Sequence, residues 1–273
     1  MGYECRYGLL NSVHYGTPQM RERCFLIGIT RLAHVEPGLP APTHRWELPR
    51  GYKGTRDVAL RTIDLFQHRH FMTAPSPKGT LPNAVTAEQA LCDLPPITEH
   101  LCGQMKKGPR RFETPLKLVE AFPPNNYIRL MKTWPRFESD GYVYDHVIRF
   151  LPRDYAIFER MRPGDQYPEA HKVALAMRDE VVTRLEMEYN QPISRQSREF
   201  KALTARYVPP YDPGKFPNKW RKMEADAPTR TIMAHIGKDT YSVVRYRGKD
   251  IEQSADLTSC YERPYPHRTA ANL

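Results

Sequence analysis

The sequence predicts a mixed α/β chain in which a two-stranded piece of a larger sheet precedes a long, irregular domain. Two apolar, strand-like segments stand close together at the start, in YECRYGLLNSVHYG and RCFLIGIT. The 26 prolines among 273 residues exceed average usage and predict long irregular connections. Hydrophobic residues at 40% and charged residues at 26% are typical of a globular protein long enough to bury a core.

The first element is a predicted hairpin. Gly16 and Pro18 mark the turn region between its two strands, and the second strand is apolar on both faces from Cys24 to Ile29. Such a strand is typical of a sheet interior covered on both sides, so we expect Cys24 in the core. No strand, crossover helix and strand follow in the first 80 residues. Because an isolated hairpin is marginally stable in water, the chain is expected to be part of a larger assembly.

Next come a connection and a short helix. The proline-rich stretch from Arg31 to about Gly54 is predicted to be a linker. The segment NAVTAEQALCDLPPI predicts a short helix, because Thr86 as N-cap and Gln89 three residues later form a capping box. Pro95 and Pro96 then stop it.

The middle of the chain interleaves basic and aromatic residues, in MKKGPRRFE, NNYIRLMKTWPRFE, SREFKALTARYVPPY and KFPNKWRKME. The formal net charge of +10 and the pI near 9.4 favour a polyanionic partner. Four such stretches predict a phosphate-binding surface, and the alternative for each is a solvated charged face. The candidate DNA-binding residues here are Lys106, Lys107, Arg110, Arg111, Lys219, Arg221 and Lys222.

The last patterned element is DAPTRTIMAHIGKDTYSVVRY, an extended segment in which β-branched and polar residues alternate around the turn HIGKDT. Thr229, Arg230 and Thr231 offer hydroxyls and a guanidinium to backbone or phosphate, and they complete the candidate DNA-binding set. The alternative is a strand pair that only caps a sheet.

Other classes of protein are not favoured. The five cysteines are odd in number and scattered, which argues against a disulfide framework and favours a cytoplasmic setting. No apolar run approaches the ~20 residues that a membrane helix needs, and the opening residues do not resemble a secretory signal. His68, His70, His100 and Cys102 are the only hints of a metal site, and without a CxxC pair we expect none.

Several segments of the chain, taken in order, resemble the motif blocks of a known enzyme family. GYECRYGLLNSVHYGTPQMRERCFLIGI resembles the eighth motif block of the DNA cytosine-5 methyltransferases, in which Pro-Gln-x-Arg-x-Arg precedes an apolar strand. PAPTHRWEL, AVTAEQALCDLPPI, NNYIRLM and YDHVIRFLPRDYAIFERMRPGD follow in the family's order, and KWRKMEADAPTRTIMAHIGKDTYSVV resembles its ninth block. The resemblance covers the chain up to about Tyr246.

The resemblance implies a bacterial-type enzyme's C-terminal part, with a fold made of a two-strand piece of an S-adenosylmethionine-dependent methyltransferase sheet plus a mixed, irregular target recognition domain. It assigns residues 1–35 to a hairpin of the catalytic lobe, 36–222 to target recognition, 223–246 to the ninth block and 247–273 to a divergent tail. The function implied is recognition of double-stranded DNA for cytosine C5 methylation, as in restriction-modification.

The resemblance also implies roles for three polar side chains. Gln19, Arg21 and Arg23 are two residues apart, so in an extended segment they line one side. The target cytosine of these enzymes is swung out of the duplex into a pocket. Arg23 is expected to hydrogen-bond the cytosine O2, whereas Gln19 and Arg21 help hold the catalytic loop and nearby phosphates. The alternative is surface charges at a hairpin turn.

Several of the family's segments do not occur in this sequence. It has no Pro-Cys nucleophile, no Glu-Asn-Val and no Phe-x-Gly-x-Gly for S-adenosylmethionine, so the chain alone is expected to be catalytically incomplete and not to bind the cofactor of the complete enzyme. Three hypotheses remain open. A second polypeptide supplies the catalytic half, or the chain is a sequence-specific DNA-binding module without catalysis, or it is a truncated or frame-shifted product, which the unmatched tail favours.

Overall fold

The computed structural model describes residues 2–49, 61, 70–95, 109–111, 115–120, 125–143, 147–149, 152–231 and 242–244. The described residues form helices and small two-stranded sheets, in keeping with the predicted mixed α/β class. Two compact units divide the chain: one contains residues 1–90 and 226–231, and the other contains residues 91–225 and 232–273. None of the described helices is long and apolar enough to cross a membrane.

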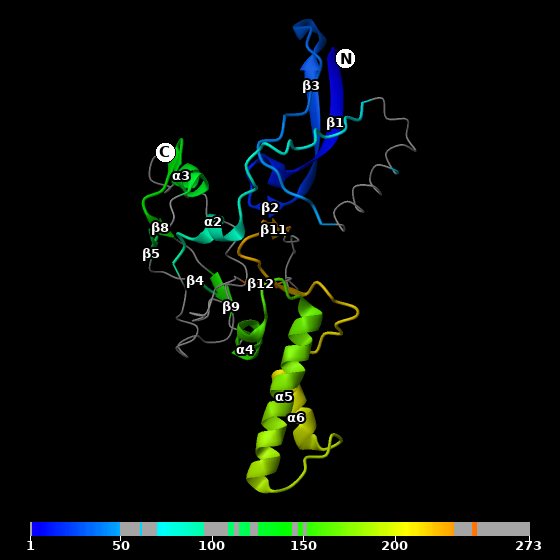
Figure 1. Cartoon of the computed structure of the whole chain (residues 1–273), viewed down its shortest axis with the longest axis vertical. Helices are drawn as coiled ribbons and strands as arrows, with labels where there is room; N and C mark the ends of the chain where they lie inside the picture. The colour runs from blue at the N-terminus through cyan, green and yellow to red at the C-terminus, as the bar shows by residue number, and fades with distance from the viewer. Residues whose placement is uncertain are drawn as a thin grey trace. The chain divides into compact units, whose positions relative to one another are not determined.

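The first unit is built on the predicted hairpin. Strands β1 (Tyr3–Asn11) and β3 (Glu22–Thr30) pair antiparallel along their whole length, as Figure 1 shows. Between them lie the 3-10 turn η1 (Ser12–Tyr15) and the two-residue strand β2 (Gln19–Met20). Gly16 ends η1 with φ 84°, a left-handed conformation that glycine adopts without strain. The prediction of two strands joined through the TPQMRE segment is confirmed.

The expectation that the second strand lies in a core is wrong for this chain. Cys24 is exposed, and so are Phe25 and Leu26, the latter with 73% of its surface accessible. The physical reason is that side chains of a strand point to the two faces of its sheet, and the faces of the two-stranded β1–β3 sheet are not covered at Phe25 and Leu26 by the described residues. The buried positions of the hairpin are Gly8, Leu10 and Asn11 in β1 and Val13 and Met20 between the strands, whereas no residue of β3 is buried.

The predicted linker is partly folded onto this turn end. The backbone amides of Thr43 and His44 both donate to the carbonyl of His14, at 2.9 and 3.0 Å. The hydroxyl of Tyr15 donates to the carbonyl of Pro40. Val13, Met20 and Ala84 form a small buried cluster, against which the partly buried Trp46 and Leu48 pack. These residues therefore belong to the first compact unit rather than to a free connection.

The predicted capping box is present. The Thr86 amide donates to the Gln89 side chain at 3.0 Å, and the Gln89 amide donates back to the Thr86 hydroxyl at 3.2 Å. Helix α2 (Ala87–Leu91) follows and ends before the two prolines that were expected to stop it.

The second unit contains short strands and most of the helices. Strands of two or three residues form three antiparallel pairs: β4 (Pro109–Arg111) with β9 (Val147–Arg149), β5 (Leu116–Lys117) with β8 (Tyr142–Val143), and β6 (Thr133–Trp134) with β7 (Phe137–Glu138). A fourth pair, β10 (Trp220–Lys222) with β12 (Ser242–Val244), is parallel. The helices are α3 (Asn126–Lys132), α4 (Pro152–Arg160), α5 (Tyr167–Tyr189) and α6 (Arg198–Tyr207).

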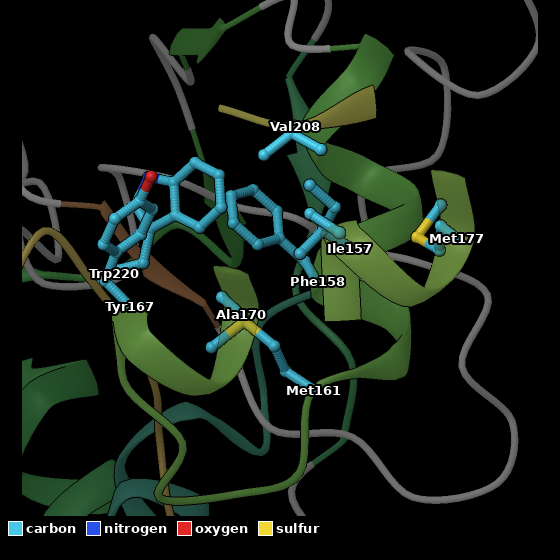
Figure 2. Close-up of a cluster of buried hydrophobic side chains, with 9 residues drawn as sticks. Ile157, Phe158, Met161, Tyr167, Ala170, Met177, Val208 and Trp220 are labelled. Atoms are coloured by element: carbon cyan, nitrogen blue, oxygen red, sulfur yellow. The ribbon is translucent and has the colours of Figure 1, made fainter. Parts of the chain in front are cut away.

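The core of this unit lies where α4, α5 and β10 meet. Phe158 and Trp220 pack edge to face with ring centroids 4.8 Å apart, and Trp220 and Tyr167 do the same at 5.1 Å (Figure 2). Tyr167 is fully buried, and its hydroxyl donates to the carbonyl of Tyr211. Helices α5 and α6 run side by side away from this cluster (Figure 1). The full set of buried members is Ile157, Phe158, Met161, Tyr167, Ala170, Ala174, Met177, Val208 and Trp220.

Candidate functional site

The segment Pro18–Arg21 is held through the carbonyl groups of four successive residues. Two threonines far along the chain bind one edge: the amide and hydroxyl of Thr229 donate to the Pro18 carbonyl at 2.9 and 3.0 Å. The hydroxyl of Thr231 donates to the Met20 carbonyl at 2.7 Å. This contact is the parallel pairing of β2 with β11 (Thr229–Arg230).

The other edge of the same segment is bound by Ser12. Its hydroxyl donates to the Gln19 carbonyl at 2.7 Å, and its amide donates to the Arg21 carbonyl at 3.0 Å. Carbonyls of an extended chain point alternately to its two edges, so the threonines and the serine each take every second one. The backbone is thereby fixed on both sides over residues that sequence analysis selected for their side chains.

Side-chain burial follows the same alternation. Met20 is 4% exposed and packs with Val13 and Ala84. Gln19 and Arg21, on either side of it in sequence, are half-buried, and Arg23 is exposed. The expectation that Gln19, Arg21 and Arg23 line one wall stays a prediction, and the anchor expected for that wall, the apolar run from Cys24 to Ile29, contains no buried residue. The Arg23 guanidinium donates to the carbonyl of its neighbour Glu22 at 2.7 Å, a contact that another acceptor could replace.

The threonines differ from Arg230 in what they contact. Both Thr229 and Thr231 use their hydroxyls on backbone carbonyls, which is one of the two uses that the sequence left open. Arg230 lies between them in β11 and is exposed. Of the three, only the guanidinium of Arg230 remains as a candidate for phosphate.

The predicted basic cluster at Lys219–Lys222 is largely internal, which corrects its assignment to a DNA surface. Lys222 is 3% exposed, and its ammonium donates to the carbonyls of Phe158 and Met161 at 3.0 and 2.9 Å. It thus caps the C-terminal end of α4. Burial lowers the pKa of Lys222, and the nearby carboxylates Asp165 and Glu159 oppose that shift.

Its two basic neighbours also have partners inside the unit. The ammonium of Lys219 lies 4.3 Å from the ring centre of Tyr211, and Lys219 itself is buried. The guanidinium of Arg221 lies 3.8 Å from the carboxylate of Glu224. These contacts stabilise the fold around β10, so we do not retain Lys219, Arg221 or Lys222 as phosphate ligands.

For the remaining predicted basic residues the structure describes no side chains. Lys106 and Lys107 lie outside the described residues, and Arg110 and Arg111 lie in β4, of which only the backbone is described. Helix α6, in contrast, exposes Arg198, Lys201 and Arg206. These three come from a stretch that sequence analysis noted as basic and aromatic but did not resolve to residues, because exposure depends on which face of the helix packs on α5.

Sequence reasoning missed the part played by Ser12. A serine after a predicted strand is most often a turn residue, and nothing in its spacing connects it to residues 19 and 21. No group of three or more histidine, cysteine or acidic side chains in the described ranges is arranged to hold a metal ion.

Comparisons with known proteins agree with the resemblance. Residues 1–80 match the family described as C-5 cytosine-specific DNA methylase. A putative type II methyltransferase of Oceanobacillus iheyensis is 29% identical over 263 residues, covering 94% of this chain and 54% of that protein. The type II methyltransferase M.AgeI of Thalassovita gelatinovora is 28% identical over 88% of this chain and 53% of its own length.

A plant protein is similar over a shorter region. DNA (cytosine-5)-methyltransferase 3 of Arabidopsis thaliana is 32% identical over 127 residues, which cover 39% of this chain and 8% of that protein. The chain is therefore homologous to cytosine-5 DNA methyltransferases. It spans about half the length of the two bacterial relatives that it matches along most of its own length.

Proposed function

We propose that this chain is the DNA-recognition portion of a cytosine-5 DNA methyltransferase, and that it binds duplex DNA and lines the pocket for the target cytosine. The observation that carries the proposal is the Pro18–Arg21 segment, which lies within the family match and is bonded at four successive carbonyls. Such bonding holds a backbone rigidly while leaving alternate side chains to act, as a binding pocket requires.

Gln19 and Arg21 of this segment, and Arg23 just beyond it in β3, take the roles expected from the resemblance. A base displaced from the duplex needs fixed donors on its Watson–Crick edge and O2. Arg23 donates to O2, since a guanidinium keeps its charge and holds its donors in a plane. Gln19 and Arg21 hold the neighbouring loop and phosphates. Arg23 exchanges its contact with the Glu22 carbonyl for the base, so it enters the pocket without leaving a buried partner unsatisfied.

Further phosphate contacts come from basic residues outside the Pro18–Arg21 segment. The exposed side chains Arg198, Lys201 and Arg206 of α6 are suited to neutralise phosphates, as is Arg230. The stretch containing Lys106, Lys107, Arg110 and Arg111 is proposed to add further phosphate contacts. Phosphate contacts position a protein on DNA without selecting a sequence, so these residues are assigned to affinity rather than specificity.

The residues present do not fit an S-adenosylmethionine site. The sequence has no Phe-x-Gly-x-Gly, and the hairpin glycine Gly8 serves chain packing: a Cβ there would lie 2.6 Å from the Leu39 side chain and 2.7 Å from the Met72 carbonyl. We therefore assign cofactor binding to the complete enzyme and derive no step through it. The thiolate and the methyl donor are assigned to a second polypeptide that carries the catalytic half.

The exposed side of β3 supports such a partner. Phe25 and Leu26 leave apolar surface in water, and the relatives contain about as much sequence again as this chain matches. Elements of the catalytic half would pack on the two faces of β3 and cover these side chains. The second candidate function is a sequence-specific DNA-binding module without catalysis. It is favoured by the lack of Pro-Cys and Glu-Asn-Val in the sequence.

Methyl transfer from labelled S-adenosylmethionine to mixed duplex DNA separates these functions. The chain alone should give no label in DNA. Addition of a polypeptide that carries the Pro-Cys and Glu-Asn-Val segments of the catalytic half should restore labelling if the enzyme is split. Label appearing in DNA with the chain alone would overturn the assignment of the nucleophile to a partner, and DNA binding with no restoration by such a partner would favour the binding module.

The role of Arg23 has its own test in the reconstituted enzyme. Arg23→Ala should lower the methylation rate about ten- to a hundredfold, because a hydrogen bond from a charged donor contributes ~1.5–3 kcal/mol. Duplex affinity should change little, since the proposed partner is the base. Lys106→Ala and Lys107→Ala are the matched controls: they should weaken binding slightly and leave the rate at saturating DNA unchanged. If Arg23→Ala weakens binding slightly and leaves the rate at saturating DNA unchanged, the role assigned to Arg23 is wrong, even if the chain is related to the methyltransferases.

A further inference from the structure

The hairpin formed by β6 and β7 presents an exposed tryptophan. Its two strands pair antiparallel, with Trp134 opposite Phe137 and only Pro135 and Arg136 between them. The Trp134 side chain is 46% exposed. The other two tryptophans differ: Trp220 is 3% exposed, and Trp46 packs against the Val13 cluster. The Trp134 indole is therefore available for contact with a partner, to which it offers an apolar ring and one N–H donor.

The hairpin is held firmly on α3. The amide and the hydroxyl of Thr133 both donate to the carbonyl of Arg129, the hydroxyl at 2.9 Å. The amide of Ser139 donates to the carbonyl of Lys132 at 2.9 Å. Helix α3 itself begins at an N-cap, where the Asn125 side chain accepts from the Ile128 amide. A side chain presented on a fixed backbone loses less conformational entropy when it binds a partner.

The turn carries backbone strain at an exposed arginine. Arg136 has φ 69°, in the left-handed region that non-glycine residues rarely occupy. Proline followed by a residue of positive φ is the pattern of a type II turn, whose third position normally takes glycine or asparagine. Strain of this kind persists where a particular side chain is needed. The result is a guanidinium two residues from the exposed indole.

Two carboxylates lie close in sequence, and both act on the backbone. Glu138 accepts from the Arg136 amide at 3.3 Å, and Asp140 accepts from the Tyr142 amide at 3.0 Å. They shape the turn and the bend after it. The exposed cations of this element are Arg129 and Arg136.

We propose that Trp134 is a DNA-contacting wedge, whose indole packs against a base step in a groove of the duplex while Arg136 and Arg129 contact the flanking phosphates. This inference rests on the proposed function, because it requires that the chain bind duplex DNA. Proteins that deform DNA insert apolar side chains between base steps and secure the flanks with basic residues. The β6–β7 hairpin carries an apolar side chain, Trp134, and a basic side chain, Arg136, within four residues. The free energy needed to unstack a base step depends on its sequence, so the wedge makes the affinity of this unit for DNA depend on sequence.

The test combines tryptophan fluorescence with DNA titration of the full chain. Acrylamide, a neutral quencher, should quench Trp134 most strongly in the free protein, and a mixed-sequence duplex should protect that emission. Trp134→Phe should remove the quenchable component, whereas Trp46→Phe should retain it. Trp134→Ala should weaken duplex binding about tenfold or more, as expected for loss of one aromatic contact with bases.

Each result decides a different point. Full duplex affinity in Trp134→Ala, together with unchanged acrylamide quenching of the wild type on DNA, overturns the wedge and leaves the proposed function standing. Absence of duplex binding by the wild-type chain at low salt overturns both. A third result is self-association that depends on concentration and disappears in Trp134→Ala, with no protection of the indole by DNA. That result assigns the indole to contact with a second copy of the chain and overturns the wedge. Far-UV circular dichroism of each variant checks that α3 and the hairpin remain folded.

Discussion

The β1–β3 hairpin and the Phe158 cluster use similar apolar side chains in opposite ways. In the cluster, Phe158, Tyr167 and Trp220 are buried by helices of the same unit. In the hairpin, Phe25 and Leu26 lie in the apolar run of β3 and are exposed. Apolar composition therefore does not by itself make a core. A helix pair can bury its stripe against a neighbour within the unit, whereas a strand that is apolar on both faces needs layers on both sides.

The largest difference between the two regions should appear on truncation. Phe158→Ala should destabilise the second unit by about 3–5 kcal/mol, because it removes a packed ring and leaves a cavity. Leu26→Ala should change the stability of the chain by less than about 0.5 kcal/mol, since little surface is buried there. Urea unfolding followed by circular dichroism at 222 nm measures the helical unit, and hydrogen exchange of the hairpin peptides measures the first. Equal costs at the two positions would mean that the hairpin is covered in solution by another part of the chain.

A smaller effect is expected at the polar edge of the cluster. Lys222→Met keeps the aliphatic stem but removes the ammonium, which leaves the carbonyls of Phe158 and Met161 without their donor. Loss of such buried bonds should cost about 1–3 kcal/mol in the same urea experiment. Lys215→Met, at an exposed lysine, is the control and should be near neutral. A stability unchanged by Lys222→Met would return Lys222 to the candidates for a surface role.

Local patterns in the sequence predicted local structure well. The hairpin and the Thr86 and Gln89 capping box appear, because each is decided by neighbouring residues. Of the extended segment predicted from Asp226 to Tyr246, the structure shows strands at Thr229–Arg230 and Ser242–Val244, and the turn HIGKDT lies outside the described residues. The long helix α5 was not predicted, although Pro168 and the Gln166 and Glu169 capping pair mark its start. Its apolar residues do not form a clear single stripe, so periodicity gave little signal.

The basic residues show where sequence reasoning stops. Lys222 and Arg198 look alike in sequence, each in a stretch that mixes cations with aromatics. One lies inside the unit on helix carbonyls and the other on an exposed helix face. Tertiary packing alone makes that distinction. The pairing of β11 with β2, across more than two hundred residues of sequence, is likewise invisible to local patterns.

The smallest effect concerns the two threonines that bind the Pro18–Arg21 segment. Thr229→Val and Thr231→Val keep the β-branched shape and remove only the hydroxyl, so each tests one bond to a backbone carbonyl. Each should cost about 0.5–1.5 kcal/mol, with Thr229→Val at the lower end because its amide still donates to Pro18. Hydrogen exchange should show faster opening of the amides in β11 and in the segment, and Thr17→Val, at an exposed threonine, should show none.

The double variant extends this comparison to function. With both hydroxyls removed, Ser12 still binds the other edge of the segment, so the chain should fold and bind duplex DNA. In the reconstituted enzyme the methylation rate should nevertheless fall, because Arg23 follows a backbone that is now held on the β11 edge by the Thr229 amide alone. Unchanged exchange together with an unchanged rate would show that Ser12 alone positions Gln19, Arg21 and Arg23, and that the pairing of β2 with β11 serves only to join distant parts of the first unit.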